Sequence, residues 1–409
     1  NMSTGSKKIF SYGQQGKLLP QEEMLEVENK KDKLVIGLPR ENTYQEKRIA
    51  LIPSAVEVLT ENGHQVILEK GAGISANFSD TDFSESGAYI VDTRKEVYQA
   101  DIILKIAPPV KSDIELFKER QTIISALHLT AQTAEYFKQM LPKKVTAISF
   151  EHLKDENDVY PIRMSISEIA GNTAMLVASE YLSNPDIGKG KMLGGFPGIP
   201  PVEVVILGAG NVGEAASRAA IAQGASVKIF DHTISKLRRI QRLLNTKVFT
   251  SIIQNNNLKK ILKEADVVIG AMHTQNSRSP VIVTEEMIQG MQKGSVIIDI
   301  SIDQGGCIET SRITSHADPI FIKHGLIHYG VPNIASRVPN TASHALSNYF
   351  TPMMLNIAEE GGIQNILRKN KGLRNGTYIY NGVITNKYIS DYFNLPYKDI
   401  DLLMAAFHG

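Results

Sequence analysis

The sequence predicts an α/β protein with two Rossmann-like domains on parallel sheets, an interdomain cleft and long helices that link the domains. Short apolar runs alternate with segments of helical periodicity through most of the 409 residues, which is typical of parallel sheets. A glycine-rich turn follows one of these runs near the middle of the chain. Residues 165–182 and a segment from His344 onward have the length and periodicity of helices that connect domains.

Composition restricts the expected partners. The chain has 44 Lys+Arg and 43 Asp+Glu, a formal net charge of +1, so we expect neither nucleic acid nor a membrane surface as a partner. The single cysteine, Cys307, excludes an internal disulfide and a cysteine metal cluster, so we expect no metal and a reducing, cytoplasmic setting. No apolar run reaches the length needed to span a bilayer.

The alternation also predicts the domain boundaries. Residues 1–31 are polar and are expected to form a helix or a loosely docked extension without chemistry. Residues 32–164 and 343–409 are predicted to form one discontinuous domain, and residues 165–342, which hold the glycine-rich turn, a second, Rossmann-like domain. The tail from Gly376 is predicted to form a hairpin followed by a helix.

Residues 202–231 have the order strand, glycine turn, helix, strand, acid, which dinucleotide binding requires. The apolar run at residues 204–207 leads into Gly208, Gly210 and Gly213. Gly208 permits a sharp turn, Gly210 lets the backbone approach a pyrophosphate, and Gly213 lets the helix pack closely on the sheet. Asp231 ends the second strand, where a carboxylate accepts ribose hydroxyls and favours NAD over NADP.

The ends of other apolar runs select further candidates, because open α/β sheets bind ligands beyond the carboxyl ends of their strands. His128, Met272, His273 and residues 301–306 follow such runs. They come from both sides of the predicted linker helix, so we expect the active site between the domains.

The segment IGLPRENTYQEKRIALIP at residues 36–53 resembles the N-terminal signature of alanine dehydrogenases and of the soluble part of proton-translocating nicotinamide nucleotide transhydrogenase. The resemblance extends from Leu34 onward and includes ALHL, SEIAG, GGFPG, GAGNVG and DISIDQGG. Asp303 in IDQGG, where transhydrogenases carry Glu, and the segment VPNIASRVPNTAS favour alanine dehydrogenase.

The resemblance implies NAD-linked oxidative deamination of L-alanine to pyruvate and ammonium, and the reverse reaction, in a hexamer. It implies that Arg48 holds the substrate carboxylate, that His128 is the acid/base, and that Asp303 activates water or ammonia beside the nicotinamide. From the residues alone, Arg48 also suits a surface position, His128 a structural role and Asp303 a helix cap. The implied cofactor contacts are Ser167 at the pyrophosphate, Asp231 and Lys236 at the adenosine ribose, and Arg312 and Asn333 nearer the nicotinamide.

Two positions depart from the family pattern. Alanine dehydrogenases typically read Lys-x-Lys-x-Pro after the third strand, whereas this chain keeps Lys105 and has Ala107 at the second, substrate-facing lysine. Arg163 stands where the family usually has an apolar residue near the substrate. Our hypothesis is that Arg163 replaces the lost cation, so that Arg48, Lys105 and Arg163 are the candidate substrate-binding residues.

Two other functions stay open at this level. The chain also suits the NAD-binding subunit of a transhydrogenase, or a regulatory NAD-binding protein that lost catalysis with the lysine. The departure at Ala107 also keeps open an amino-acid dehydrogenase that acts on a different 2-amino acid.

Overall fold

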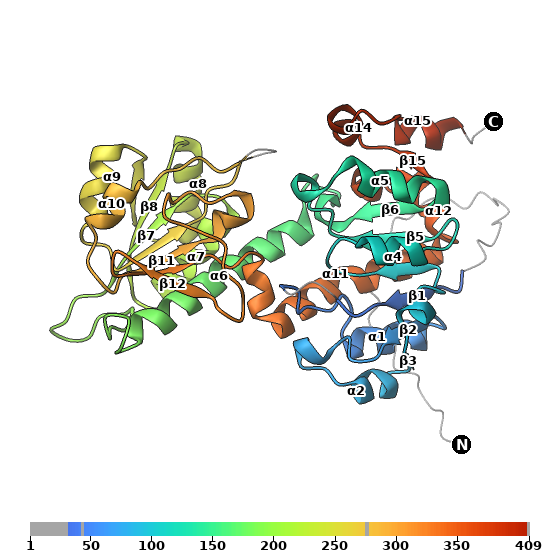
Figure 1. Cartoon of the computed structure of the whole chain (residues 1–409), viewed down its shortest axis with the longest axis horizontal. Coiled ribbons are helices and arrows are strands. Elements are labelled where there is room, and N and C mark those ends of the chain that lie inside the picture. The colour runs from blue at the N-terminus through green and yellow to red at the C-terminus, as the bar shows by residue number, and fades with distance from the viewer. Residues whose placement is uncertain (1–31, 42–44, 275–277, 407–409) are drawn as a thin grey trace, which may run out of the picture.

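Two α/β domains, each with its own sheet, make up the computed structural model (Figure 1), which describes residues 32–41, 45–274 and 278–406. The predicted fold class is confirmed. The expected N-terminal extension at residues 1–31 lies outside the described residues.

The first sheet has the strand order β15-β14-β6-β5-β4-β1-β2-β3. Strands β1 to β6 pair in parallel and contribute to the hydrophobic cores on both faces of the sheet, but β3 at one edge is only partly buried and exposes Tyr89. The strands are β1 (Val35–Leu38), β2 (Gln65–Glu69), β3 (Tyr89–Val91), β4 (Ile102–Leu104), β5 (Thr122–Ser125), β6 (Thr146–Ser149), β14 (Thr377–Tyr380) and β15 (Val383–Ile384).

The helices of this domain divide between the two faces of the sheet. Helices α1 and α11 share a hydrophobic core with one face, and α3, α4, α5 and α14 share a core with the other. The helices are α1 (Pro53–Glu61), α2 (Asp80–Glu85), α3 (Arg94–Val97), α4 (Lys111–Leu116), α5 (Ala134–Met140), α11 (Pro339–Glu359), α12 (Ile363–Lys369), α13 (Lys371–Gly376), α14 (Lys387–Phe393) and α15 (Ile400–Ala405).

The second sheet has the order β12-β13-β11-β10-β7-β8-β9. Helices α6, α7 and α8 share a core with one face of this sheet, and α9 and α10 share a core with the other. The elements are α6 (Pro161–Ser183), β7 (Glu203–Leu207), α7 (Asn211–Ala222), β8 (Ser226–Asp231), α8 (Ile234–Leu244), β9 (Phe249–Ile252), α9 (Asn255–Leu262), β10 (Val267–Gly270), α10 (Glu285–Gln289), β11 (Val296–Asp299), β12 (Ile320–Lys323) and β13 (Leu326–Tyr329).

The sequence predicted parallel sheets, but neither sheet is entirely parallel. Strands β12, β14 and β15 pair antiparallel with their neighbours. Two residues connect β12 to β13 and two connect β14 to β15. Such short connections allow only an antiparallel pair, because a parallel neighbour requires a crossover of about a dozen residues. The predicted hairpin and helix of the tail are confirmed as β14, β15 and α14.

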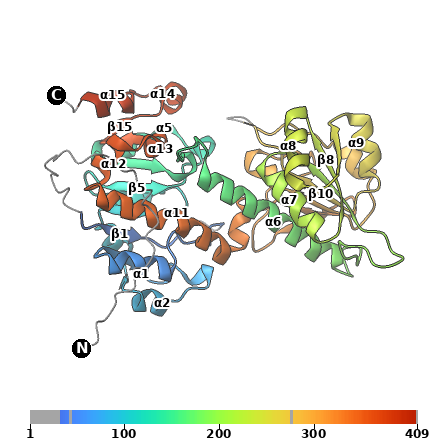
Figure 2. The same ribbon diagram turned by 180° about the vertical axis from the view of Figure 1, so that it is seen from behind.

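Helices α6 and α11 link the two domains (Figures 1 and 2). Ile162 at the start of α6 belongs to the core of the first domain, whereas Ala174 and Leu182 belong to the core of the second. Both helices begin earlier than predicted, at Pro161 and Pro339, because proline is favoured in a first helical turn. Within the described ranges, no helix is both long enough and apolar enough to cross a membrane.

Candidate active site between the domains

The glycine turn of the second domain has the close contacts that the sequence predicted. Gly208 has φ 111°, and a Cβ there would lie 2.4 Å from the Ala271 carbonyl oxygen. A Cβ on Gly213 would lie 1.9 Å from the Gly208 carbonyl oxygen. By contrast, no described atom lies within 4 Å of a Cβ built on Gly210, directly before α7.

The start of α7 therefore offers backbone N–H groups beside open space. No side chain among the described residues caps this helix. The free N–H groups and the positive end of the helix suit a pyrophosphate. Ser167 lies on α6 one turn before Gly171, where a Cβ would lie 2.5 Å from the Val212 carbonyl oxygen, so Ser167 is near this turn. The residues present thus fit a dinucleotide.

Asp231 ends β8 as a buried side chain. Its two carboxylate oxygens accept the backbone N–H groups of Ala209 and Thr233, both at 2.8 Å. These bonds orient the carboxylate at the glycine turn, where a ribose would lie. Lys236 is exposed, and its charge helps to lower the pKa of His273, after desolvation and Arg163. Lys236 and His273 therefore lie near each other at this edge of the sheet.

Two further predicted cofactor residues, Met272 and Arg312, have side chains that pack outside the glycine turn, although the Met272 backbone nitrogen would lie 3.3 Å from a Cβ on Gly208. Met272 packs against the core formed with α9 and α10, and its carbonyl oxygen accepts the Ser279 hydroxyl at 3.2 Å. The exposed Arg312 guanidinium lies over the Phe321 ring, 4.2 Å from its centroid. No recorded contact joins Arg312 to the glycine turn in the described part of the chain.

Arg48 is buried in the first domain beside Glu46. Its Nε and Nη2 atoms donate to the two Glu46 oxygens, both at 2.8 Å. Burial would lower the pKa of Arg48, but the Glu46 carboxylate outweighs it and raises that pKa. The remaining nitrogen, Nη1, is buried with no hydrogen-bond partner among the described residues. The guanidinium is thus held on one side and unpaired on the other.

The second domain supports this pair directly. Asn333 follows β13, and its Nδ2 donates to Glu46 Oε2 at 2.9 Å. The Ser336 hydroxyl donates to Glu46 Oε1 at 3.3 Å and accepts the Lys47 N–H at 2.8 Å. The backbone N–H of Asn333 donates to Asp303 Oδ1 at 3.0 Å. One residue, Asn333, therefore connects the arginine–glutamate pair of the first domain to Asp303 of the second.

His128 projects from the loop after β5 and is half exposed. Its Nε2 lies 3.5 Å from Oε1 of Glu151, which follows the neighbouring strand β6. Glu151 Oε2 accepts the Leu127 N–H at 3.0 Å. Burial would raise the pKa of Glu151, but the charges of His128 and His152 and the backbone N–H groups of Leu127 and His128 outweigh it and lower that pKa. Glu151 therefore stays ionised and orients His128.

Asp303 lies in the 3₁₀ turn η5 (Ile300–Gln304) that follows β11. Desolvation by the surrounding protein raises the pKa of Asp303, although its side chain still reaches solvent. The N–H of Asn333 and the charges of His128 and Arg48 act in the opposite direction. Arg48 and His128 of the first domain thus lie within electrostatic range of Asp303 of the second.

The two departures from the family pattern, Ala107 and Arg163, lie on different elements: Ala107 follows β4 beside the retained Lys105, and Arg163 lies on α6. Lys105 is buried, and its Nζ donates to Glu41 at 3.2 Å and to the Ala107 carbonyl oxygen at 2.6 Å. The Lys105 ammonium is therefore already paired. Arg163, in the first turn of α6, lies 5.0 Å above the Tyr160 ring centroid and has no recorded hydrogen bond or ion pair among the described residues.

The charge of Arg163 affects one histidine in each domain. Its charge contributes, after desolvation, to a lowered pKa of His152 in the first domain and of His273 in the second. The half-buried guanidinium therefore lies at the domain junction.

Sequence reasoning missed two side chains of this site, Glu46 and Glu151. Glu151 directly follows a strand, so the rule that selected His128 also selects it. Glu46 follows no strand, and only the folded structure identifies it, through its contacts with Arg48 and with Asn333, which is 287 residues away in the chain.

These features define a class: a two-domain α/β protein with a glycine turn of the dinucleotide-binding type in one domain and charged side chains of the other domain at the junction between them. Two family models match, "Alanine dehydrogenase/PNT, N-terminal domain" at residues 37–170 and "Alanine dehydrogenase/PNT, C-terminal domain" at residues 174–387. The chain therefore belongs to the alanine dehydrogenase/PNT family, as its motifs predicted.

Individual relatives cover nearly the whole chain. An alanine dehydrogenase of Methanococcus maripaludis is 39% identical over 89% of this chain and 98% of its own length. One of Staphylococcus saprophyticus is 37% identical over 90% and 99%. A solved L-alanine dehydrogenase superposes with a TM-score of 0.81 at 34% identity, over 88% of this chain and 99% of that one. A transhydrogenase of Sinorhizobium meliloti, at 21% identity and TM-score 0.72, covers 87% of this chain and 99% of its own and shares the fold.

Proposed function

We propose that the protein catalyses the NAD-linked, reversible oxidative deamination of L-alanine to pyruvate and ammonium. The curated alanine dehydrogenases at 37–39% identity support this reaction. The observation that carries the proposal is the buried Nη1 of Arg48, which has no hydrogen-bond partner among the residues that the structure describes, on a guanidinium within electrostatic range of Asp303. A buried donor without a partner is costly, and a substrate carboxylate supplies that partner.

The cofactor would be held by the second domain. The turn of Gly208, Gly210 and Gly213, with Ser167, would hold the pyrophosphate, and Asp231 the adenosine ribose. Lys236, Met272, His273, Arg312 and Asn333 are the further proposed contacts. When bound, the nicotinamide exchanges a hydride with the substrate Cα. Asp231 favours NAD over NADP, because its buried carboxylate would repel a 2′-phosphate.

Three residues would then act on the substrate. Arg48 holds the carboxylate and so fixes the orientation of the Cα. His128, oriented by Glu151, takes a proton from the amine in deamination and returns one in amination. Asp303 accepts a proton from the water that adds at this carbon before ammonium leaves. The raised pKa of the Asp303 carboxyl suits this role, because it brings proton uptake closer to neutral pH.

Organisation and setting complete the proposal. We assign residues 32–164 and 343–409 to substrate binding and residues 165–342 to the cofactor. Arg163 is proposed to supply the cation that Ala107 lacks. Lys105, paired with Glu41, is proposed to hold the loop at Ala107 in place rather than to bind substrate directly. We further propose a cytoplasmic hexamer whose long helices α6 and α11 contribute contacts between subunits.

One assay panel tests the function and the substrate together. Purified protein is mixed with NADH, ammonium and one 2-oxo acid at a time, and NADH oxidation is followed by absorbance. The proposal expects pyruvate to give the highest kcat/KM. A higher kcat/KM for a larger or dicarboxylic 2-oxo acid would identify that acid as the substrate in place of pyruvate. NADH binding without turnover on any acid would contradict the enzymatic proposal.

A further inference from the structure

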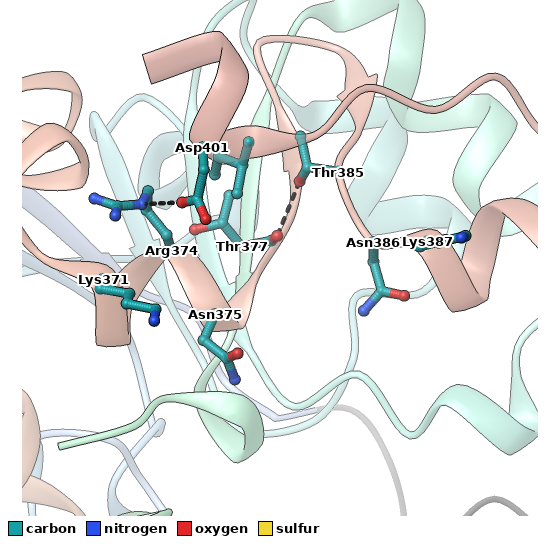
Figure 3. Close-up of a pocket in the computed structure, with 9 residues that line it drawn as sticks. Lys371, Arg374, Asn375, Thr377, Thr385, Asn386, Lys387 and Asp401 are labelled. Carbon is teal, nitrogen blue, oxygen red and sulfur yellow. Dashed lines mark hydrogen bonds and ion pairs between the residues drawn. The ribbon is translucent and has the colours of Figure 1, made fainter. Parts of the chain in front are cut away.

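A cavity of about 220 Å³ lies in the first domain, between α13, the β14–β15 hairpin, α14 and α15 (Figure 3). It is separate from the site between the domains, since it shares none of that site's residues. The match to the C-terminal family model ends at residue 387. Most of α14 and all of α15, which border the cavity, therefore lie beyond the matched region. The lining residues are Lys371, Arg374, Asn375, Thr377, Thr385, Asn386, Lys387, Ile400 and Asp401.

The cavity has an excess of positive charge. Arg374 and Asp401 neutralise each other through an ion pair at 2.6 Å. The exposed side chains of Lys371 and Lys387 have no recorded hydrogen bond or ion pair within the described ranges. At longer range, Lys371 acts on Asp158, which has its own ion pair with Lys154 at 2.9 Å. Two positive charges at this cavity are therefore left without a direct counter-ion.

Amide donors add to these charges. Asn386 accepts the Ile389 N–H through Oδ1 at 3.0 Å, which leaves its NH₂ group to donate. Asn375 donates one Nδ2 hydrogen to the His152 carbonyl oxygen at 2.7 Å and keeps a second. Figure 3 shows Asn375 and Asn386 on opposite sides of Thr377 and Thr385, while Arg374 turns toward Asp401. Ammonium and amide groups at a small cavity are the donors that an oxyanion requires.

The cavity is also connected to His128. A Cβ on Gly372 would lie 1.9 Å from the Lys154 carbonyl oxygen, and one on Gly376 would lie 2.6 Å from that of Ser149. Helix α13 therefore rests directly on residues 149–154, and Asn375 bonds within the same segment. Glu151 belongs to this segment and lies 3.5 Å from His128. Helix α13 thus packs against the segment that carries Glu151.

We propose that this cavity binds a phosphate group, as the free ion or as part of a small phosphorylated metabolite, and that its occupancy alters turnover through α13 and Glu151. A volume of about 220 Å³ is below that of sites for drug-sized ligands, so it suits such a small group. The part that concerns turnover rests on the proposed dehydrogenase function. The part that concerns binding does not.

Binding is tested by thermal unfolding with saturating NADH, which keeps phosphate away from the pyrophosphate site. Inorganic phosphate and glycerol phosphate form separate arms, each against NaCl at equal ionic strength. We expect a saturable rise in Tm of about 3 °C for at least one phosphate. The double variant Lys371→Gln/Lys387→Gln should lose this rise, whereas the control Lys111→Gln/Lys138→Gln, with exposed lysines of the same domain, should keep it. An equal rise in the cavity variant, or one matched by NaCl, would overturn the site.

Turnover is then measured with the same proteins. Phosphate should change the kcat of the wild type at least about twofold and leave that of the cavity variant unchanged. Binding without any change in kcat would overturn the coupling and keep the site. If the wild type shows no dehydrogenase activity at all, the proposed function fails while the binding result still stands.

Discussion

At the residue scale, Arg48 is rigidly held and still available to a ligand. Two of its nitrogens bind Glu46, so the guanidinium plane is fixed, and Nη1 is buried without a partner among the described residues. An unpaired buried donor costs about 1–3 kcal/mol, which a bound carboxylate would recover. Such an arrangement favours binding over the stability of the free protein, as expected at a functional site.

Arg163 is the residue whose role can be tested most sharply. Arg163→Met should raise the KM for pyruvate about tenfold or more and leave the Kd for NADH unchanged, because a cation near the carboxylate is lost. Adding Ala107→Lys should lower the KM again, since it restores the family lysine. Steady-state kinetics of the two variants measure both effects.

The control is Arg120→Met, because Arg120 is largely exposed in the same domain. An unchanged KM in Arg163→Met, or no improvement on adding Ala107→Lys, would refute the compensation.

Asp303 makes a prediction about pH. Desolvation raises its pKa above 3.8, so its ionised form destabilises the fold, by an amount that solvent screening reduces because the side chain is exposed. Stability from this group is complete below the unfolded pKa and is lost as pH rises through the folded pKa. Asp303→Asn should therefore raise Tm at pH 7 and leave it unchanged at about pH 3, while kcat falls about 100-fold. A lower Tm at pH 7 than the wild type would contradict this.

Single residues were predicted from two signals, the ends of strands and the family motifs. His128 and Asp303 follow apolar runs, so their position at a sheet edge was predictable. The Glu46–Asn333 bond was not, because it depends on how two domains meet. The pairing of Lys105 with Glu41 was also hidden, since a motif match gives a position and not a partner.

At the element scale, the strand–turn–helix unit β7–α7 is the part of the fold that the sequence specifies most fully. Gly208 and Gly213 are required by contact, since added Cβ atoms would meet backbone oxygens, whereas a Cβ on Gly210 would meet none of the described atoms. Prediction succeeded here because periodicity, turn residues and the acid at the end of β8 all agree. It failed for the starts of α6 and α11, where a proline in the first turn begins the helix earlier than its apolar periodicity.

Gly213→Ala tests this element. The new methyl group would lie 1.9 Å from the Gly208 carbonyl oxygen, so β7 and α7 must separate. We expect a loss of about 1–3 kcal/mol in unfolding free energy and at least about tenfold weaker NADH binding.

The matched control for this variant is Gly290→Ala, where the nearest atom would lie 3.4 Å away. Denaturant unfolding and NADH fluorescence titration measure both variants. Wild-type NADH affinity in Gly213→Ala would contradict the proposed pyrophosphate site.

At the scale of the whole molecule, the proposed site exists only where the two domains meet. Asn333 and Ser336 of the second domain bond to Glu46 of the first, and Asp303 lies within electrostatic range of Arg48 and His128. The sequence predicted two domains and a site between them, because strand ends on both sides of α6 carry the polar residues. It did not predict which side chains touch across the junction.

The most direct test is the rate of NADH oxidation with pyruvate and ammonium in His128→Asn. Asparagine keeps the positive φ of 46° at this position, so the loop is retained. The control is His324→Asn, an exposed histidine with φ 54° in the β12–β13 turn. We expect His128→Asn to lower kcat about 1000-fold with an unchanged Kd for NADH, and His324→Asn to behave as the wild type. Turnover at the wild-type rate in His128→Asn would contradict the proposal that this imidazole transfers the substrate proton.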